Sequence, residues 1–337
     1  MKKLILGVDG GNSKTDFFLF DTDGNFLDFH RGPTCSHEQF KDSYQGAFNA
    51  LKKNLDSFFF RNSLKPSEIA AAVFGLAGVD TPIQKTNMEQ VIADLGFLNY
   101  KVVNDSFLPI KAATSKGYGV CSINGAGTSC GGIDSFGAYL QVGGIGSLVG
   151  DEAGGFYIAR MAIRSCYDEQ YRFGKPTSLS KIVMDLLNVT NKYYLMEAIS
   201  AQAVARTIDY NALTLAVFQE AKHNDAVSLD ILKQVGENIA KSVSGCIVNL
   251  DFIDGVEIVL AGSVWVKGAS PIMYEAFEKK VRELTKHDIK ITTLAVPPAT
   301  GAIIWAMELA NREFPNINVR QFIINNVSEQ LNKLDRS

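Results

Sequence analysis

Two segments of the sequence run through the same order of strand, glycine-containing turn, strand, turn and strand. In the first, Ile5–Asp9 precedes the turn Gly10–Thr15, and in the second, Gly119–Ile123 precedes the turn Asn124–Ser129. The two turns lie about 115 residues apart, which is the size of a domain, whereas solenoid repeats recur every ~20–50 residues. The repeat therefore predicts two related α/β domains that face each other.

The spacing of apolar residues predicts the remaining elements. The expected strands are Lys3–Asp9, Thr15–Asp21, Asn25–Arg31, Ile69–Leu76, Tyr100–Val103, Gly119–Ile123, Cys130–Asp134, Ala138–Val142, Val256–Leu260 and Ile289–Leu294. The expected helices are Glu38–Phe60, Ile83–Leu95, Gly154–Tyr171, Leu229–Leu250, Pro271–Thr285 and Thr300–Leu309. No low-complexity linker interrupts the chain, so we expect a compact hinge near Ala112–Tyr118. Domains 1–115 and 116–337 follow, and it stays open whether the last helix packs back on the N-terminal domain.

Composition excludes several classes of protein. The chain has 337 residues, is 46% hydrophobic and carries a net charge of −3, so it lacks the basic surface that binds nucleic acid. Its apolar runs, such as Ile258–Gly262, fall far short of the ~20 residues that cross a membrane. Met1–Lys3 leads directly into an apolar strand without a signal-peptide pattern, which favours the cytoplasm. The five cysteines form no CxxC pair and the four histidines no HExxH motif, which argues against disulfides and zinc.

The first candidate site is the turn that follows Asp9. Its glycines let the backbone approach a ligand and turn with positive φ, and successive N–H groups can bind phosphate oxygens. Asp9 ends a strand and can hold Mg²⁺ through water. The alternative is an ordinary glycine-rich hairpin, since the P-loop and Rossmann patterns are both absent. The residues of this turn are Gly10, Gly11, Asn12, Ser13, Lys14 and Thr15.

The second candidate site is the equivalent turn of the repeat. Together, two such hairpins on facing domains can bind the β- and γ-phosphates of a nucleotide from both sides. The residues of the second turn are Gly125, Ala126, Gly127, Thr128 and Ser129.

The third candidate is Asp105, which follows the expected strand Tyr100–Val103. A carboxylate there can accept the proton of an attacking hydroxyl, the acid–base step that phosphoryl transfer needs. Asn104 or Asp105 can instead be a simple helix N-cap.

Two further segments are rich in small residues. Gly143–Gly155 holds too many glycines for a helix or a regular strand, and its Asp151 and Glu152 can bind sugar hydroxyls or cap the next helix. Leu260–Trp265 is a strand that enters a small-residue turn, which suits close packing against an adenine ring or a plain strand-to-helix connection.

In this order, the five motifs resemble those of the BadF/BadG/BcrA/BcrD ATPase family and, within it, the N-acetylglucosamine kinases. The resemblance runs from Gly7 to about Leu309 and is most specific in GVDGGNSKTD and GIGSLVGDEAGG. It implies a two-domain, ribonuclease H-like (actin-like ATPase) fold of the α/β class, with ATP in the cleft between the domains.

The resemblance also implies roles for single residues. The first phosphate site is implied to consist of Asp9 and Gly10–Thr15, and the second of Gly125–Thr128. The adenosine is implied to lie beside Gly262, Ser263 and Lys267. Asp105 is implied to be the base at the sugar 6-hydroxyl. The sugar pocket is implied to contain Ser36, Thr128, Ser129, Gly144, Ile145, Gly146 and Asp151. The chain departs from the N-acetylglucosamine kinases at Ile145, where Trp is frequent, at Ser36, near a frequent Asn, and at Ala126, where Thr is common.

These implications predict an ATP- and Mg²⁺-dependent kinase that phosphorylates the 6-hydroxyl of N-acetylglucosamine or a close amino sugar. N-acetylmuramic acid and glucosamine stay open as substrates. The expected partners are the sugar and ATP, with no nucleic acid or membrane, and a homodimer stays open. The alternative is an ATP-driven activator of a dehydratase or reductase, in which cysteine thiolates hold an iron–sulfur cluster at a dimer axis. Cys130 and Cys166 are the only cysteines near suitable loops, and their spacing is not typical of a cluster.

Overall fold

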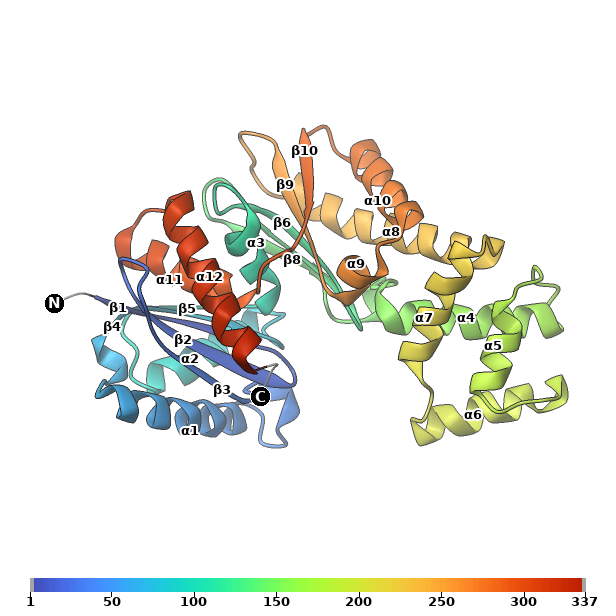
Figure 1. The fold of residues 1–337 in the computed structure, drawn as a ribbon, viewed down its shortest axis with the longest axis horizontal. Coiled ribbons are helices and arrows are strands. Elements are labelled where there is room, and N and C mark those ends of the chain that lie inside the picture. Colours follow the sequence, from blue (N-terminus) through green and yellow to red (C-terminus); the bar gives the residue numbers. More distant parts are fainter. Residues whose placement is uncertain (1–2, 335–337) are drawn as a thin grey trace.

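The computed structural model describes residues 3–334 and contains two five-stranded mixed sheets (Figure 1). The first sheet consists of β1 (Leu4–Gly10), β2 (Lys14–Asp21), β3 (Phe26–Pro33), β4 (Ile69–Leu76) and β5 (Tyr100–Val103). The second consists of β6 (Gly119–Asn124), β7 (Thr128–Ile133), β8 (Tyr139–Gly143), β9 (Val256–Ala261) and β10 (Ile289–Thr293). The helices that connect the first sheet are α1 (Tyr44–Asn62), α2 (Pro82–Asp94) and α3 (Leu108–Ala113).

The two sheets have the same topology. The strand order is β3-β2-β1-β4-β5 in the first and β8-β7-β6-β9-β10 in the second. The first strand of each sheet pairs antiparallel with the second and parallel with the fourth. The repeat seen in the sequence is therefore a structural repeat, and the predicted α/β fold of two related units is confirmed.

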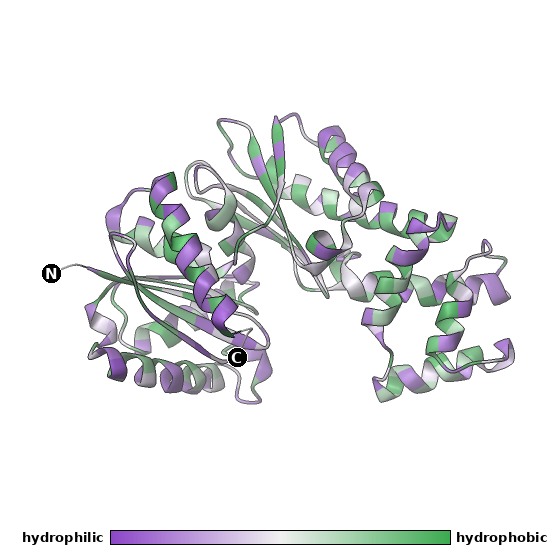
Figure 2. Ribbon diagram, in the orientation of Figure 1, coloured by the Kyte–Doolittle hydropathy of each residue, from purple (hydrophilic) through white to green (hydrophobic). Residues whose placement is uncertain are grey.

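The strands of the first sheet are apolar on both faces because helices cover both faces. Phe18 and Phe20 point into the cluster that contains α11 (Ala299–Asn311), whereas Phe17 points into the cluster with α1 and α2. All three rings are fully buried. Figure 2 shows hydrophobic strands in the centre of this sheet and hydrophilic outer faces on α1 and α12 (Ile317–Leu334).

The two C-terminal helices pack on the first sheet. A Cβ atom on Gly7 of β1 would lie 2.6 Å from Ile303 of α11, so only glycine allows this close approach. Ile323 and Val327 of α12 belong to the same buried cluster as Phe18. Figure 1 shows α12 lying across the strands of the first sheet. The division of the chain into domains at residues 115 and 116 stays a prediction.

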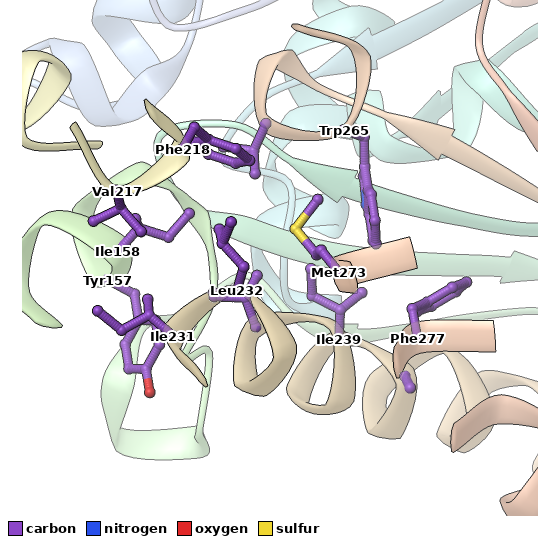
Figure 3. Close-up of a cluster of buried hydrophobic side chains, with 14 of the residues drawn as sticks. Tyr157, Ile158, Val217, Phe218, Ile231, Leu232, Ile239, Trp265, Met273 and Phe277 are labelled. Carbon is purple, nitrogen blue, oxygen red and sulfur yellow. The ribbon is translucent and has the colours of Figure 1, made fainter. Parts of the chain in front are cut away.

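The second sheet carries a larger set of helices. These are α4 (Gly154–Tyr171), α5 (Leu179–Leu186), α6 (Leu195–Ala205), α7 (Tyr210–Lys222), α8 (Ala226–Val248), α9 (Ser263–Gly268) and α10 (Pro271–Leu284). Figure 3 shows their common core, in which Phe218 of α7, Leu232 of α8 and Met273 of α10 converge. Apolar spacing predicted α4, α8 and α10, whereas no range was predicted for α5, α6, α7, α9 or α12. No helix of residues 3–334 is both long and apolar enough to cross a membrane.

Two expectations about local structure are wrong. The predicted helix Glu38–Phe60 begins at Tyr44, because Ser43 adopts φ 50°, ψ −114°, which no α-helix contains, and Phe40 is extended. The glycines of the first phosphate-site turn were expected at positive φ, but neither Gly10 nor Gly11 has it. At Gly125 and Gly127 of the second turn a Cβ atom would meet nothing within 4 Å, so the space above this turn is open to a ligand.

Candidate active site

The candidate residues gather where the parallel strands of both sheets end. β1, β4 and β5 are parallel, so Asp9, Asp80 and Asp105 follow at one edge of the first sheet. In the second sheet, β6 and β9 are parallel, and their ends lead to Gly125 and Gly262. Ligands of open α/β sheets bind at such carboxyl edges.

The first turn is tight and is fixed by the chain around it. Gly11 N donates to Lys14 O (2.9 Å), and Thr34 Oγ1 donates to Gly11 O (2.8 Å). Asn12, Ser13 and Lys14 are exposed, so their polar groups are available to a ligand. Thr15 is fully buried, and its Oγ1 accepts a hydrogen bond from Cys35 N (3.1 Å), which ties β2 to the segment after β3.

The second turn is bound to the start of α4. Gly155 N donates to Gly125 O (2.8 Å) and Phe156 N donates to Ala126 O (3.0 Å). A Cβ atom on Gly154 would lie 2.7 Å from Gly127 O, so glycine is required where helix and turn meet. The turn thus sits at the N-terminus of an 18-residue helix, whose partial positive charge favours phosphate groups.

The predicted adenosine residues lie beside this second turn. Gly262 has φ 92°, and a Cβ atom there would lie 2.4 Å from Asn124 O. Ser263 and Lys267 belong to α9 and are exposed. Trp265 anchors α9, because its Nε1 donates to Ser122 Oγ of β6 (3.1 Å) inside the core.

Two carboxylates of the first sheet carry raised pKa values. Burial, followed by the charges of Asp105 and Asp16, raises the pKa of Asp9 to about 7. Burial, followed by the charge of Asp80, raises the pKa of Asp105 to about 6. Asp16 also forms an ion pair with Arg31, whose Nε and Nη2 donate to its carboxylate at 2.6 and 2.8 Å. Asp9 and Asp105 therefore lie close enough to repel each other, and a cation between them and a phosphate group would relieve that repulsion.

The residues fit a magnesium ion that is bound mainly by water and nucleotide. No group of three or more His, Cys, Asp or Glu side chains in residues 3–334 could enclose a metal. Mg²⁺ usually keeps several waters and uses one or two carboxylates together with substrate phosphates. Asp9, beside the first turn, is the carboxylate that such an ion would use.

Asp105 begins a short 3-10 helix, Asp105–Phe107. Asn104 is its N-cap, since Asn104 Oδ1 accepts a hydrogen bond from Ser106 N (2.9 Å). The capping role that the sequence left open for Asn104 or Asp105 thus belongs to Asn104, and the carboxylate of Asp105 is not needed for it.

Asp80, which no sequence motif indicated, lies between the two sheets. Asp80 Oδ1 accepts hydrogen bonds from Asn104 Nδ2 (2.9 Å) and from Gln141 Nε2 of β8 (2.7 Å). A Cβ atom on Gly144 would lie 3.3 Å from the same oxygen. The only sequence feature that could have indicated Asp80 was its position after the buried strand Ile69–Leu76.

The glycine-rich loop is organised by Asp151. Its Oδ2 accepts hydrogen bonds from Gly144 N (2.9 Å) and Gly146 N (2.7 Å). Gly143, Gly144 and Gly146 all have positive φ, so the loop follows a path that other residues rarely adopt. Asp151 therefore shapes the loop, and its other oxygen remains for a ligand.

A cavity of about 600 Å³ opens between this loop, the second turn and the helices α4, α6 and α7. It brings together the predicted residues Ala126, Gly127, Thr128, Gly144, Gly146 and Asp151. Its far wall consists of side chains that the sequence did not indicate: Phe156, Tyr157, Arg160, Ile163, Ile199, Ile208 and Tyr210.

Three predicted sugar residues do not line this cavity. Ile145 is 59% exposed, and Ser129 lies on β7 beside Gly144. Ser36 is 2% exposed on the first-sheet side, and its Oγ has no hydrogen-bond partner among the described residues. A buried hydroxyl without a partner is a group that a bound ligand can satisfy.

Several known proteins are similar to this chain. It is 26% identical over 306 residues to the N-acetylmuramic acid/N-acetylglucosamine kinase of Clostridium acetobutylicum, which covers 90% of this chain and 98% of the relative. It is 24% identical over 319 residues to the N-acetyl-D-glucosamine kinase of Dictyostelium discoideum, with coverages of 91% and 98%.

Solved structures share the fold. A candidate N-acetylglucosamine kinase from Chromobacterium violaceum superposes with a TM-score of 0.65 at 20% identity and covers 92% of this chain and 99% of its own. A ROK family glucokinase from Streptomyces griseus, in complex with glucose and AMPPNP, has a TM-score of 0.51 at 15% identity and the same coverages. The expected sugar kinase and actin-like ATPase fold is thereby confirmed. The family model of the BadF/BadG/BcrA/BcrD ATPases matches residues 6–306, and this chain belongs to that family.

Proposed function

We propose that this protein transfers the γ-phosphoryl group of ATP to the 6-hydroxyl of N-acetylglucosamine or a closely related amino sugar. The observation that carries the proposal is the pair Asp9 and Asp105. Two buried carboxylates of raised pKa stand at the ends of the parallel strands β1 and β5, on either side of β4, and the charge of Asp105 contributes to the raised pKa of Asp9. Phosphoryl transfer needs one group of this kind for a metal ion and one for the attacking hydroxyl.

Asp105 is the proposed base. Because its pKa is raised to about 6, it is ionised at neutral pH yet basic enough to accept a proton from a sugar hydroxyl. Its Oδ atoms hold and orient that hydroxyl, while the N–H groups of the two turns orient the phosphates. Mg²⁺, held through Asp9, supplies charge neutralisation when bound. The protein's own contribution is mainly the positioning of the two substrates.

Two observations support the identity of the sugar: the names of the curated relatives and the cavity beside Asp151 on the second sheet. The two curated relatives are named for N-acetylglucosamine, and one of them also for N-acetylmuramic acid. The cavity beside Asp151 has the size of a small-molecule site. We propose that N-acetylglucosamine and N-acetylmuramic acid are both candidates and that the reaction takes place in the cytoplasm.

A panel assay tests the proposal. ATP consumption is measured with N-acetylglucosamine, N-acetylmuramic acid, N-acetylmannosamine, glucosamine and glucose, and NMR of the product locates the phosphate. We expect turnover with at least one N-acetylated sugar and a 6-phosphate product. Equal, basal ATP hydrolysis with all five sugars would contradict the proposal.

The dehydratase-activator alternative is disfavoured by the cysteines. All five are buried and free, and burial raises the pKa of Cys121, Cys130 and Cys166 above the ordinary thiol value. An iron–sulfur cluster shared between two subunits requires cysteine thiolates that reach the surface at the dimer axis. A colourless purified protein is therefore expected, whereas a brown one would favour the activator.

A further inference from the structure

The Asp80 carboxylate links Asn104, the residue before the proposed base Asp105, to Gln141 of the second sheet. Asp80 follows β4, Asn104 follows β5, and Gln141 lies on β8 of the second sheet. Asp80 Oδ1 accepts hydrogen bonds from both amides, at 2.9 Å from Asn104 Nδ2 and 2.7 Å from Gln141 Nε2. One oxygen atom thus joins the two sheets at the edge where the site residues gather.

We propose that Asp80 is a positioning residue for phosphoryl transfer, which holds Asp105 in place through Asn104 and ties this geometry to the second sheet through Gln141. The inference rests on the proposed function, in which Asp105 is the base.

The first step is the path from Asp80 to Asp105. Asn104 is 5% exposed and has two hydrogen-bonding ends. Its Nδ2 donates to Asp80, and its Oδ1 accepts from Ser106 N, one residue beyond Asp105. The bond to Asp80 therefore fixes which end of the amide points at the turn. Without it, the amide is free to rotate, and the turn that carries Asp105 loses its cap.

The second step is the link across the two sheets. Gln141 Nε2 also lies 3.3 Å from Gly143 O, at the start of the glycine-rich loop. The Asp80 oxygen lies beside Gly144 of the same loop, which Asp151 shapes. A change in the position of this loop is therefore transmitted to the Asn104 turn through a single carboxylate. The loop can thus adjust the base when a sugar is bound.

A purely structural role for Asp80 is the alternative. Asp80 precedes the N-cap Thr81 of α2, and Asp80 N donates to Gln84 Oε1 (3.1 Å). That bond uses the backbone of Asp80 and not its carboxylate. The Gln84 side chain also accepts from Thr81 N (2.9 Å), so Gln84→Ala removes this half of the capping box of α2 and leaves both carboxylate bonds intact. Gln84→Ala is therefore the matched control.

The test compares steady-state kinetics of Asp80→Ala, Asp80→Asn, Gln141→Ala and Gln84→Ala with the wild type. We expect Asp80→Ala to lower kcat about 10²-fold, the loss that misplacement by about 1 Å can cause, with the KM for ATP changed less than about threefold. Asp80→Asn keeps an oxygen that accepts both bonds and should lose about tenfold or less. Asp80→Ala and Gln141→Ala should combine non-additively because they remove the same bond.

Hydrogen exchange at the Ser106 amide gives a readout that does not depend on activity. Exchange should accelerate in Asp80→Ala and not in Gln84→Ala. A raised sugar KM with unchanged kcat in Asp80→Ala would show that Asp80 binds the sugar directly. Equal kcat losses in Asp80→Ala and Gln84→Ala would show that Asp80 acts only through the cap of α2. Either result overturns the proposal. If the wild type phosphorylates none of the sugars, the proposed function fails, while unchanged exchange at Ser106 in Asp80→Ala refutes the positioning role separately.

Discussion

The two sheets of this protein have one topology but end in different chemistry. At the carboxyl edge of the first sheet stand Asp9, Asp80 and Asp105, and the pKa of each is raised mainly by burial. At the same edge of the second sheet stand Gly125 and Gly262, with open space or backbone around them. The repeat has thus been specialised: the first sheet supplies charged groups, and the second supplies room and backbone amides.

The connections between equivalent strands of the two sheets also differ, because the second sheet has many more helices inserted. Between β3 and β4 the chain forms one long helix, α1, whereas between β8 and β9 it forms five, α4 to α8. Three of these helices wall the cavity beside Asp151. We therefore expect changes in the first sheet to lower kcat and changes in the second to raise KM, and the following variants test that division.

The largest effect is expected from Asp105→Asn. The amide cannot accept the proton of the 6-hydroxyl, so kcat should fall roughly 10²–10⁴-fold, the usual contribution of a positioned base. The affinities for ATP and sugar should stay within a few-fold, as measured by calorimetry. Asp94→Asn, an exposed aspartate at the end of α2, is the matched control. Near-wild-type turnover of Asp105→Asn would end its assignment as the base.

Asp9→Asn should lower the rate about 10–10²-fold and raise the Mg²⁺ concentration needed for half-maximal rate. The physical reason is the loss of the carboxylate through which the ion is held beside the phosphates. Sugar binding, measured without nucleotide, should not change. If the magnesium dependence equals that of the wild type, Asp9 has only a structural role.

Asp151→Ala tests the second sheet and should raise the sugar KM at least tenfold with little change in the KM for ATP. It removes the acceptor for Gly144 N and Gly146 N as well as an oxygen for the ligand, and charge-assisted bonds of this kind contribute on the order of 1.5–3 kcal/mol. The neighbouring Glu152→Ala, which removes only a 3.4 Å contact with Arg160, is the control. A fall in kcat alone would contradict the division of roles.

The pH dependence of kcat should report Asp105. Because its pKa is raised to about 6, the base becomes protonated, and the rate falls, as the pH drops through about 6 instead of about 4. At pH 5 we therefore expect about a tenfold loss at saturating substrates. Asp80→Asn removes one cause of the raised pKa, so its acid limb should move to lower pH. An acid limb near pH 4 in the wild type would mean that Asp105 does not set the rate.

The sequence predicted the strands that carry the candidate site better than the helices that line its cavity. All ten strands were expected within about two residues. The inner strands, such as β4, are continuous apolar runs, and the outer ones are bounded by glycine and polar turns. Asp9 and Asp105 were predicted as site residues because they end such strands. Helices α5 to α7 were missed; α6, for example, buries only Leu195 and has no clear apolar stripe. The cavity wall formed by Ile199, Ile208 and Tyr210 was missed with them.

Long-range contacts were the other part that no local pattern could supply. Asp80 and Gln141 are 61 residues apart, and only the packing of the two sheets brings them to hydrogen-bonding distance. The helix expected to begin at Glu38 was instead predicted too long, because it begins at Tyr44. Its apolar spacing continues through Phe40, but Phe40 is extended and folds over Gly46, which has no side chain to prevent it. Tertiary packing there overrides the local pattern.

The smallest effect is expected from Ile145→Trp. Ile145 is 59% exposed and does not line the cavity, although its neighbours Gly144 and Gly146 do. The indole ring introduced at position 145 would reach a bound sugar only when the loop covers the sugar. The ring should then leave less room for a bulky substituent on that sugar. We expect kcat/KM for N-acetylmuramic acid relative to N-acetylglucosamine to fall about threefold, less than the ~10–200-fold that one methylene group makes in a closed apolar pocket. Leu148→Trp is the control, because Leu148 is 99% exposed on the same loop and does not line the cavity either. If both variants give the wild-type ratio, residue 145 does not contact the sugar, and selectivity must come from the cavity wall of α4, α6 and α7.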